Sequence, residues 1–301
     1  MKLDTSLQAA IGEILQEEAA DSTPIERMNR VGGGDINAAA HLRTGKRDYF
    51  IKWNPRPLPG MFLAEARGLR ELAAAGKVRV PRVYGSREGT GKRPAFIVME
   101  WLGGGANKQG RKLGEALGRG LAALHQHSQP SFGWRFENYI GSLPQHNDET
   151  TDWLTFYRDR RIGFQMELAA SKGRMPARRR RQIVRLMERL DEWIDPSEVR
   201  PALLHGDLWG GNYMAGPGGE PVLIDPAVYF GDREVELAFT ELFGGFSPTF
   251  YAAYDEVWPL SPGYQARKQL YQLYPLMVHL NLFGEGYGGS VDNVLAYYLA
   301  S

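Results

Sequence analysis

The segment LLHGDLWGGNYM, residues 203–214, gathers groups that can do chemistry into one short stretch. Asp207 offers a carboxylate that can take a proton, and Asn212 offers an amide oxygen shortly after it. The glycines around them favour a shaped loop, because glycine adopts backbone turns that bulkier residues resist. A simpler interpretation is a tight turn in which the Asp and Asn side chains bond their own backbone. The segment alone leaves both interpretations open.

A second carboxylate, Asp225, follows in the segment LIDP. The intervening chain, with AGPGGEP as its turn, predicts a hairpin in which residues 213–215 pair with residues 222–224. That pairing would bring Asn212 and Asp225 side by side, with Asp207 nearby. Oxygen ligands of this kind suit a hard cation such as Mg²⁺, which usually shares its coordination shell with substrate phosphates. An Asp, an Asn and a further Asp in this order therefore favour phosphoryl transfer.

Phosphoryl transfer also needs a lysine on a strand to contact the phosphates and a glutamate on a helix to hold it. Lys52 lies in the strand-like segment YFIKWN, and Glu65 falls on the next predicted helix. A lysine on a strand is usually solvated. We predict a phosphate-binding role for Lys52 because it comes before the glutamate and the Asp, Asn and Asp motifs in the order that phosphoryl transfer requires. The turn GGGDINAA is the candidate phosphate-covering turn, although it does not fit G-x-G-x-x-G. Its glycines are Gly32, Gly33 and Gly34.

The elements that must position these residues fall into two parts. The first hundred residues read as a β-rich part: a helix over residues 5–19, three strands of a meander between residues 25 and 54, a helix over residues 62–75, and two more strands in PRVYGS and PAFIVMEWL. After them, helical patterns cover residues 109–127, 150–172 and 176–194, and recur near residues 234–244, 262–283 and 290–299. We therefore predict an α+β fold with a β-rich lobe, residues 1–102, and a mostly helical lobe, residues 103–301.

Composition narrows the class of protein. Lys plus Arg number 36 and Asp plus Glu number 35, so the net charge of +1 gives no overall field that would attract nucleic acid or an anionic membrane. The absence of cysteine excludes disulfides, thiolate metal sites and cysteine nucleophiles. The N-terminus has no apolar signal region, and no run approaches the roughly 18 apolar residues of a membrane span. We expect a cytoplasmic protein that acts on a small molecule.

Three other features have ordinary structural interpretations. The four arginines at residues 178–181 do not predict nucleic-acid binding, because successive helix residues point about 100° apart and the run wraps around the helix. His125 and His127 diverge on a helix in the same way, so a packing or capping role is favoured over metal binding. Trp209 would either plug the loop or form a platform for a sugar, and both interpretations remain open.

Together these segments resemble the fructosamine-3-kinase, or ketosamine kinase, family, within the protein-kinase-like fold that includes aminoglycoside phosphotransferases. Aminoglycoside and choline kinases share the Asp, the Asn and the second Asp. The tryptophan in HGDLWGGN, the block FGW…NYIG and the segment IDPAVYFG resemble the ketosamine kinases in particular. The resemblance covers nearly the whole chain and also includes GGGDIN, FIKWN, AEARGLREL, IVMEWL, DWLTFYRDRRIGFQ and LLHGDLWGGN.

The resemblance implies ATP and Mg²⁺ as cofactors and a role for each candidate residue. Asp207 would accept the proton of the sugar hydroxyl, while Asn212 and Asp225 would hold Mg²⁺. Lys52 would contact the nucleotide phosphates and pair with Glu65. The adenine would rest against a hinge formed by Met99, Glu100, Trp101 and Leu102. The substrate would contact His205, Trp209, Asn138 and Tyr139.

Three departures from the family pattern bear on specificity. Asp35 stands where many relatives have cysteine, so control through that cysteine does not apply here. Asp232 and Glu236 replace an expected His and Asp, and Glu137 replaces an expected Asp. Each change alters size or charge near the site, so it bears on fine specificity rather than on the reaction.

The expected reaction transfers the γ-phosphoryl group of ATP to the 3-hydroxyl of a free or protein-linked ketosamine. A phosphate on C3 lies next to the C2 carbonyl, so loss of an acidic hydrogen beside that carbonyl can expel it and release the amine, which amounts to deglycation. The alternatives are a kinase of an aminoglycoside, choline or homoserine-like alcohol, and a nucleotide-binding pseudokinase. The complete set of Lys52, Asp207, Asn212 and Asp225 argues against the pseudokinase.

Overall fold

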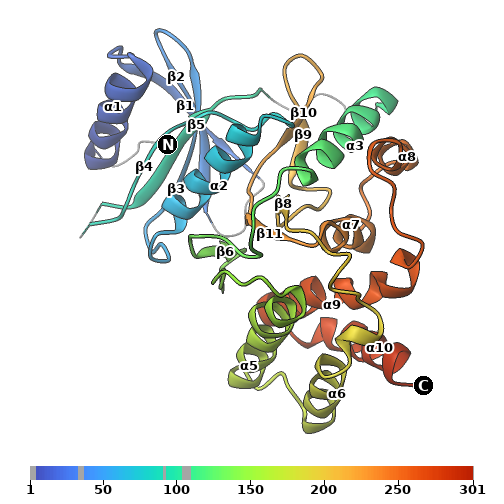
Figure 1. Ribbon diagram of the computed structural model, residues 1–301. Coiled ribbons are helices and arrows are strands. Elements are labelled where there is room, and N and C mark those ends of the chain that lie inside the picture. Colours follow the sequence, from blue (N-terminus) through green and yellow to red (C-terminus); the bar gives the residue numbers. More distant parts are fainter. Residues whose placement is uncertain (1–4, 33–36, 91–92, 104–109, 301) are drawn as a thin grey trace. The chain divides into compact units, whose positions relative to one another are not determined.

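The computed structural model describes residues 5–32, 37–90, 93–103 and 110–300, which form two compact units (Figure 1). The first unit contains residues 1–113 and 213–226, and the second contains residues 114–212 and 227–301. The expected boundary after residue 102 does not account for the inserted hairpin. The hairpin joins the first unit because Val222 forms a parallel β-bridge with Arg79, whose carbonyl also accepts a hydrogen bond from the Leu223 amide at 2.9 Å.

The first unit is built on a five-stranded antiparallel sheet. The predicted meander of β1, β2 and β3 is confirmed, and β5 lies between β3 and β4, giving the order β1-β2-β3-β5-β4. Apolar residues alternate along β3, whereas β5 is apolar and buried from Ala95 to Met99, so the sheet is covered on both faces at β5. The strands are β1 (Ile25–Val31), β2 (Ala38–Thr44), β3 (Asp48–Asn54), β4 (Val83–Arg87) and β5 (Ala95–Glu100).

The two faces of this sheet have different tasks. The predicted N-terminal helix, α1 (Thr5–Ala19), packs its apolar side on one face, where Ile51 and Val98 belong to the core that it covers (Figure 1). Because side chains alternate along a strand, Lys52 points to the opposite face, in register with Ala39 and Ile97 on the neighbouring strands. The core on one face thereby fixes a lysine on the other.

Helix α2 (Met61–Ala75) carries Glu65 and matches the predicted helix at residues 62–75. It ends at Gly76, which has a φ of 63° and donates its amide to the Leu72 carbonyl, as left-handed C-terminal caps do. The second strand pair of this unit is the hairpin of β9 (Tyr213–Ala215) and β10 (Pro221–Leu223).

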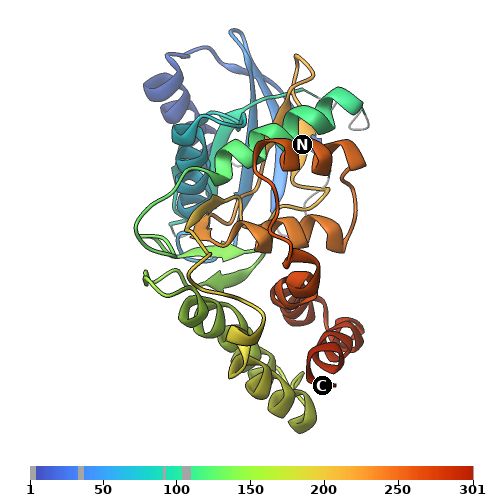
Figure 2. The ribbon, with the colours of Figure 1, turned by 45° about the vertical axis from the view of Figure 1, so that its right-hand side comes forward.

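The second unit is mostly helical, as predicted, so the α+β fold class is confirmed. The features that were not predicted include the short helix α8, the strand pair of residues 138–145, and a π-helix that interrupts the helical region near residue 160. Helices α9 and α10 lie side by side in both views, with α6 packed on α10 (Figures 1 and 2). The helices are α3 (Arg111–His125, which begins in the first unit), α4 (Trp153–Thr155), the π-helix η1 (Phe156–Gly163), α5 (Phe164–Ser171), α6 (Ala177–Met187), η2 (Leu190–Glu192), α7 (Arg233–Leu242), α8 (Pro248–Val257), α9 (Tyr264–Phe283), η3 (Glu285–Tyr287) and α10 (Gly288–Leu299).

Two small antiparallel pairs complete this unit. Strand β6 (Asn138–Ile140) pairs with β7 (Leu143–Gln145), and β8 (Ala202–Leu204) pairs with β11 (Tyr229–Gly231). Strand β8 leads directly into the loop that contains Asp207. Among the described residues, no helix has the length and apolar character needed to cross a membrane.

The arginine run on α6 does not form one basic face. Arg179 is buried and makes ion pairs at 2.7 Å with Glu285 and with Asp292. Its neighbour Arg180 points elsewhere and pairs with Glu167 at 2.6 Å. The run therefore fixes α6 to its neighbours, as expected for residues that wrap around a helix.

Candidate active site

A cluster of three charged side chains lies on the face of the five-stranded sheet opposite α1, with Lys52 and Glu65 mostly buried and Asp225 partly exposed. The ammonium of Lys52 lies 2.8 Å from Glu65 Oε1 and also pairs with Asp225 Oδ1. Burial alone lowers the pKa of Lys52, but the charges of Asp225 and Glu65 outweigh it and hold that pKa above its usual value. Burial raises the pKa of Glu65, against the opposing charge of Lys52. Lys52 is therefore a fixed cation on a strand, held by two carboxylates.

The hairpin delivers Asp225 to this cluster, in a register that differs from the predicted one. Tyr213 pairs with Leu223 and Ala215 pairs with Pro221, so the second strand begins and ends one residue earlier than predicted. The turn sets this register, because the Gly216 amide donates to the Glu220 carbonyl at 2.7 Å. Asp225 has a φ of 57°, a left-handed conformation that costs a non-glycine residue about 1–2 kcal/mol.

The loop after β8 holds Asp207 and Asn212 together in the second unit. Gly206 has a φ of 83°, and a Cβ added to it would lie 1.9 Å from the Ala227 carbonyl oxygen, so only glycine fits there. The amide nitrogen of Asn212 donates to the Asp207 backbone oxygen at 2.7 Å and to its carboxylate at 3.0 Å. The loop is therefore a built structure in which the asparagine orients the aspartate.

Each unit, taken by itself, carries an oxygen group of a kind that suits a hard cation. The nitrogen of the Asn212 amide is engaged by Asp207, which leaves its oxygen as the ligand group. The Asp225 carboxylate, 46% exposed, supplies a charged oxygen. Carboxylate and amide oxygens are the protein ligands that Mg²⁺ prefers, with phosphates and water completing its coordination. The described residues contain no cluster of three or more His, Cys, Asp or Glu that could hold a metal ion without such help.

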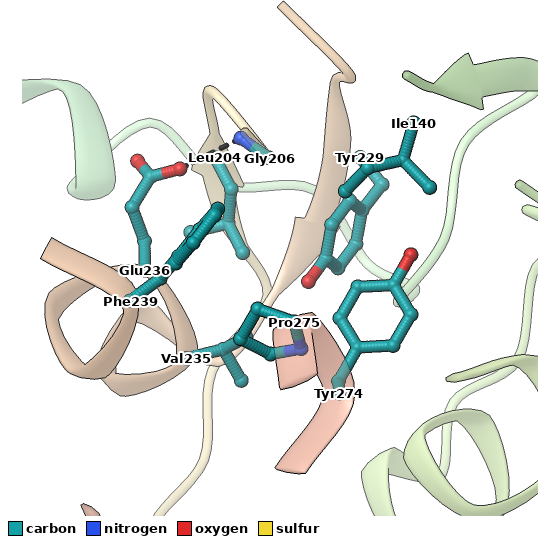
Figure 3. Close-up of a pocket in the computed structure, with 9 residues that line it drawn as sticks. All are labelled: Ile140, Leu204, Gly206, Tyr229, Val235, Glu236, Phe239, Tyr274 and Pro275. Carbon is teal, nitrogen blue, oxygen red and sulfur yellow. Dashed lines mark hydrogen bonds between the residues drawn. The ribbon is translucent and has the colours of Figure 1, made fainter. Parts of the chain in front are cut away.

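A buried glutamate on α7 anchors the Asp207 loop. Glu236 accepts a hydrogen bond from the Gly206 amide at 2.7 Å (Figure 3), and another from the His205 amide at 3.1 Å. The ring of His125 lies 2.9 Å from the same carboxylate and 2.8 Å from the Tyr254 hydroxyl. Burial raises the pKa of Glu236, but the hydrogen bond and charge of His125 outweigh it and hold that pKa below its usual value. Glu236 is therefore a buried carboxylate whose hydrogen bonds hold the backbone of the loop before Asp207 in place.

Sequence reasoning identified Glu236 only as a departure and His125 only as a packing residue. His125 does pack, edge to face against Tyr254, but it also bonds the anchor. The available signal was a charged residue among the apolar positions of REVELAF, because a carboxylate inside a buried helix needs donors.

We expect Glu236→Gln to lower both the stability and kcat. The amide replaces a charged acceptor, and hydrogen bonds to charged groups contribute about 1.5–3 kcal/mol each. The depressed pKa of Glu236 means that this stabilisation is present above its usual value of 4.5 and is lost as pH falls below it. Urea unfolding at pH 7 and pH 4 should therefore show a stability difference between wild type and variant that shrinks at the lower pH.

Glu241→Gln is the matched control, because Glu241 lies on the same helix in a pair with Lys268 that is about one quarter exposed, and the amide oxygen of the variant can still accept the hydrogen bond from the Tyr264 hydroxyl. We expect it to change stability by less than about 1 kcal/mol. A Glu236→Gln variant as stable and active as the Glu241→Gln variant would contradict the anchoring role.

The predicted hinge residues lie at the end of β5 in the first unit. Met99 and Leu102 are buried, and the Glu100 carboxylate bonds Arg79 at 2.5 Å. Trp101 stacks on the His41 ring with centroids 4.1 Å apart. On β2, His41 lies two residues after Ala39, which pairs with Lys52 on β3. Because every second residue of a strand points to the same face, His41 and Lys52 lie on the same face of the sheet. The hinge segment therefore lies beside the face that carries the cation.

The glycine turn is described only in part. Gly32 follows β1 and is exposed, whereas Gly33, Gly34 and Asp35 lie outside the described residues.

The four residues assigned to the substrate by resemblance have different surroundings. Trp209 is 44% exposed, and its ring lies against Gly211, so it both covers the loop and offers a free face. Tyr139 is half-buried on β6. His205 is fully buried, and its Nδ1 accepts a hydrogen bond from the Asp207 amide at 3.3 Å. His205 therefore lies inside the loop, and its contact with the substrate stays a prediction.

The side chain of Asn138 also has partners inside the protein. It is buried, its amide nitrogen donates to the Val228 carbonyl at 2.7 Å, and its oxygen accepts from Gln145 and Asn147. These partners engage the side chain internally. Glu137, beside it, accepts from the Asn147 amide at 2.9 Å.

The fold and the two groups of polar residues define a phosphotransferase of the protein-kinase-like class. An aminoglycoside phosphotransferase solved with AMP-PNP and hygromycin B shares this fold, with a TM-score of 0.63 and 15% identity, over 97% of this chain and 99% of the other. The chain belongs to the fructosamine kinase family, whose model matches residues 7–301.

Relatives in this family are similar over most of their length. A probable ketoamine kinase of Enterococcus faecium is 43% identical, over 88% of this chain and 92% of the relative. A chloroplastic protein-ribulosamine 3-kinase of Oryza sativa subsp. japonica is 39% identical, over 98% and 86%. A crystal structure from Thermobifida fusca, named "putative fructosamine-3-kinase", superposes with a TM-score of 0.85 at 31% identity, over 98% and 99%.

Proposed function

We propose that the protein transfers the γ-phosphoryl group of ATP to the 3-hydroxyl of a ketosamine. The observation that carries this proposal is the family match over residues 7–301, in a chain that retains Lys52, Asp207, Asn212 and Asp225. Relatives named ketoamine kinase and protein-ribulosamine 3-kinase support ketosamines over aminoglycosides or choline as acceptors. The aminoglycoside enzymes share the fold alone.

In this proposal Asp207 accepts the proton of the acceptor hydroxyl. The loop geometry supports the role, because Asn212 bonds the Asp207 carboxylate and Glu236 fixes the two preceding amides. A base held in this way needs little reorganisation when the hydroxyl attacks the phosphorus. The new bond joins the sugar oxygen to the γ-phosphorus, the bond to the β,γ-bridging oxygen breaks, and ADP leaves.

The nucleotide would lie against the face of the sheet that carries Lys52. Lys52 is the cation for the phosphates, Glu65 holds it in place, and the segment from Met99 to Leu102 flanks the adenine. Asn212 and Asp225 would hold Mg²⁺, which would neutralise charge on the phosphate oxygens. Since Asp225 pairs with Lys52 in the described structure, the same carboxylate also balances the lysine before the nucleotide arrives.

The proposed product is unstable by its own chemistry. The open-chain ketosamine 3-phosphate loses a proton from C1 to form an enaminol, and the electron pair then expels inorganic phosphate from C3. Water hydrolyses the resulting imine, which releases the amine and a 3-deoxydicarbonyl sugar. No group on the protein is needed for these steps, so deglycation follows from the position of the phosphate.

A panel of acceptors tests this function. We expect magnesium-dependent ATP consumption with synthetic ribulosamines and fructosamines, and none with choline, homoserine or an aminoglycoside. After filtration removes the enzyme, phosphorus NMR over hours at 37 °C should show loss of the sugar phosphate while proton NMR shows free amine appearing.

The outcomes separate the alternatives. A persistent phosphate, or a phosphate on a terminal hydroxyl, would overturn deglycation while leaving a kinase. Turnover with choline or an aminoglycoside alone would favour the small-molecule kinase. Tight ATP binding with no turnover on any acceptor would indicate a pseudokinase.

A further inference from the structure

Arg161 is a charged side chain that the proposed reaction does not explain. It lies in the π-helix η1, within the segment DWLTFYRDRRIGFQ, and is completely buried. Its guanidinium lies 3.9 Å from the centroid of the Tyr229 ring and 4.5 Å from that of Phe156. Among the described residues no carboxylate pairs with it, whereas Arg160 beside it forms an exposed pair with Asp148 at 3.3 Å.

A buried cation without a counter-ion destabilises a fold unless its hydrogen bonds and surroundings compensate. Arg161 donates to the His146 carbonyl at 2.6 Å and to the Asn147 side-chain oxygen at 2.8 Å, and its Nε has no partner among the described residues. Both acceptors immediately follow β7. The guanidinium fork therefore clamps the end of the β6–β7 hairpin with two directed bonds, as a planar side chain can and an ammonium cannot.

A buried hydrogen-bond network continues from this clamp to the Asp207 loop. Asn147 donates to Asn138 at 3.1 Å, and Gln145 donates to the same oxygen at 2.8 Å. Gln145 also donates to the Ala227 carbonyl at 2.9 Å. The Ala227 amide in turn donates to the His205 carbonyl at 2.8 Å, two residues before the proposed base.

Two tyrosines join Arg161 to the same loop from another side. The Tyr274 hydroxyl donates a hydrogen bond to Gln145 at 2.7 Å. Tyr274 and Tyr229 also line a cavity of about 10 Å³, whose other lining residues include Gly206 and Glu236 (Figure 3). This space suits about one water molecule and no substrate. The pKa of Tyr274 is raised, mainly by burial. The charge of Arg161 lowers this pKa and the charge of Asp207 raises it, so Tyr274 senses both groups. Arg161 and the Asp207 loop are therefore connected by packed tyrosine rings as well as by hydrogen bonds.

We propose that Arg161 is a positioning residue for phosphoryl transfer: it fixes the β6–β7 hairpin and, through Gln145 and Ala227, the backbone of the Asp207 loop. The inference rests on the proposed function. Arg161 touches neither nucleotide nor reacting atoms in this role. It keeps the base in register with the acceptor, where a displacement of about 1 Å can cost 10²-fold in rate.

The test compares kcat with KM. We expect Arg161→Lys, which keeps the charge but loses the fork, to lower kcat for a ketosamine about 30-fold, with the KM for ATP changed less than about two-fold. Arg160→Lys, one position earlier and exposed, should behave like wild type. Assays are run at least about 20 °C below the melting temperature of each variant, with ATP binding measured by calorimetry, so that unfolding does not lower kcat.

A second variant tests the same hydrogen-bond network at a residue other than Arg161. Gln145→Met keeps the bulk and removes the bonds to Asn138, Ala227 and Tyr274, and we expect the same selective loss of kcat. The double variant should lose little more than either single variant, because both break one network. The inference would be overturned if the losses of kcat in the two single variants multiplied fully in the double variant, or if Arg161→Lys had the kcat of wild type. In either case, turnover of ketosamines by the wild type would leave the proposed function standing. A wild type inactive on every ketosamine would overturn the proposed function and this inference with it.

Discussion

Asp207→Asn is expected to lower kcat by about 10³–10⁴-fold while ATP still binds. The variant keeps the size of the side chain and an oxygen that can accept the Asn212 hydrogen bond, so the loop should keep its shape. It loses the carboxylate that takes the hydroxyl proton. Lys52, Glu65 and Asp225 belong to the other unit and are untouched, so the nucleotide should bind as before. Single-turnover kinetics with a ribulosamine, together with ATP calorimetry, measure the two effects separately.

The control for this variant is Asp191→Asn, which removes an exposed carboxylate from η2. It should leave kcat within about two-fold of wild type, as expected for a surface change. Turnover by Asp207→Asn that is close to that of the control would remove Asp207 from the role of base.

Asp225→Ala is expected to abolish the magnesium dependence of ATP binding and to lower kcat by about 10³-fold. The cation would lose its charged ligand, and the phosphates would lose the charge that the cation neutralises. Lys52 would also lose one of its two carboxylate partners, which leaves it with Glu65. ATP titrations with and without Mg²⁺ should therefore converge, and the residual affinity should come from Lys52 and the adenine contacts.

Glu220→Gln, on the same hairpin, is the control for this change. Glu220 pairs with Arg79 at the surface and should leave the magnesium dependence intact. If the two titrations of Asp225→Ala differ as much as those of wild type, Asp225 does not hold the metal.

Much of the first unit could be predicted because its pattern is local. The alternation in YFIKWN indicates a strand with Lys52 on one face, and the turns between the first three strands predict a meander. The hairpin register could not be predicted in the same way, since Leu223 and Ile224 are both apolar and suit either pairing. A backbone bond across the turn, from Gly216 to Glu220, decides between them.

The second unit was harder to predict where its contacts join distant segments. The bond between His125 and Glu236 and the route from Arg161 to the Asp207 loop depend on tertiary packing that no spacing rule contains. The same limit applies to the surroundings of two residues assigned to the substrate. Motifs assign Asn138 and His205 to the substrate, but their burial follows from neighbours far along the chain.

The hairpin over residues 213–226 also constrains how this gene can be recombined. A chimera that takes residues 1–102 from one relative and the remainder from another leaves Lys52 and Arg79 from one parent and their partners Asp225 and Glu220 from the other. Such a junction appears harmless on a linear map, yet it splits two ion pairs within a single compact unit. An exchange that keeps parental pairs intact must move residues 1–113 and 213–226 as one block, which requires three crossovers.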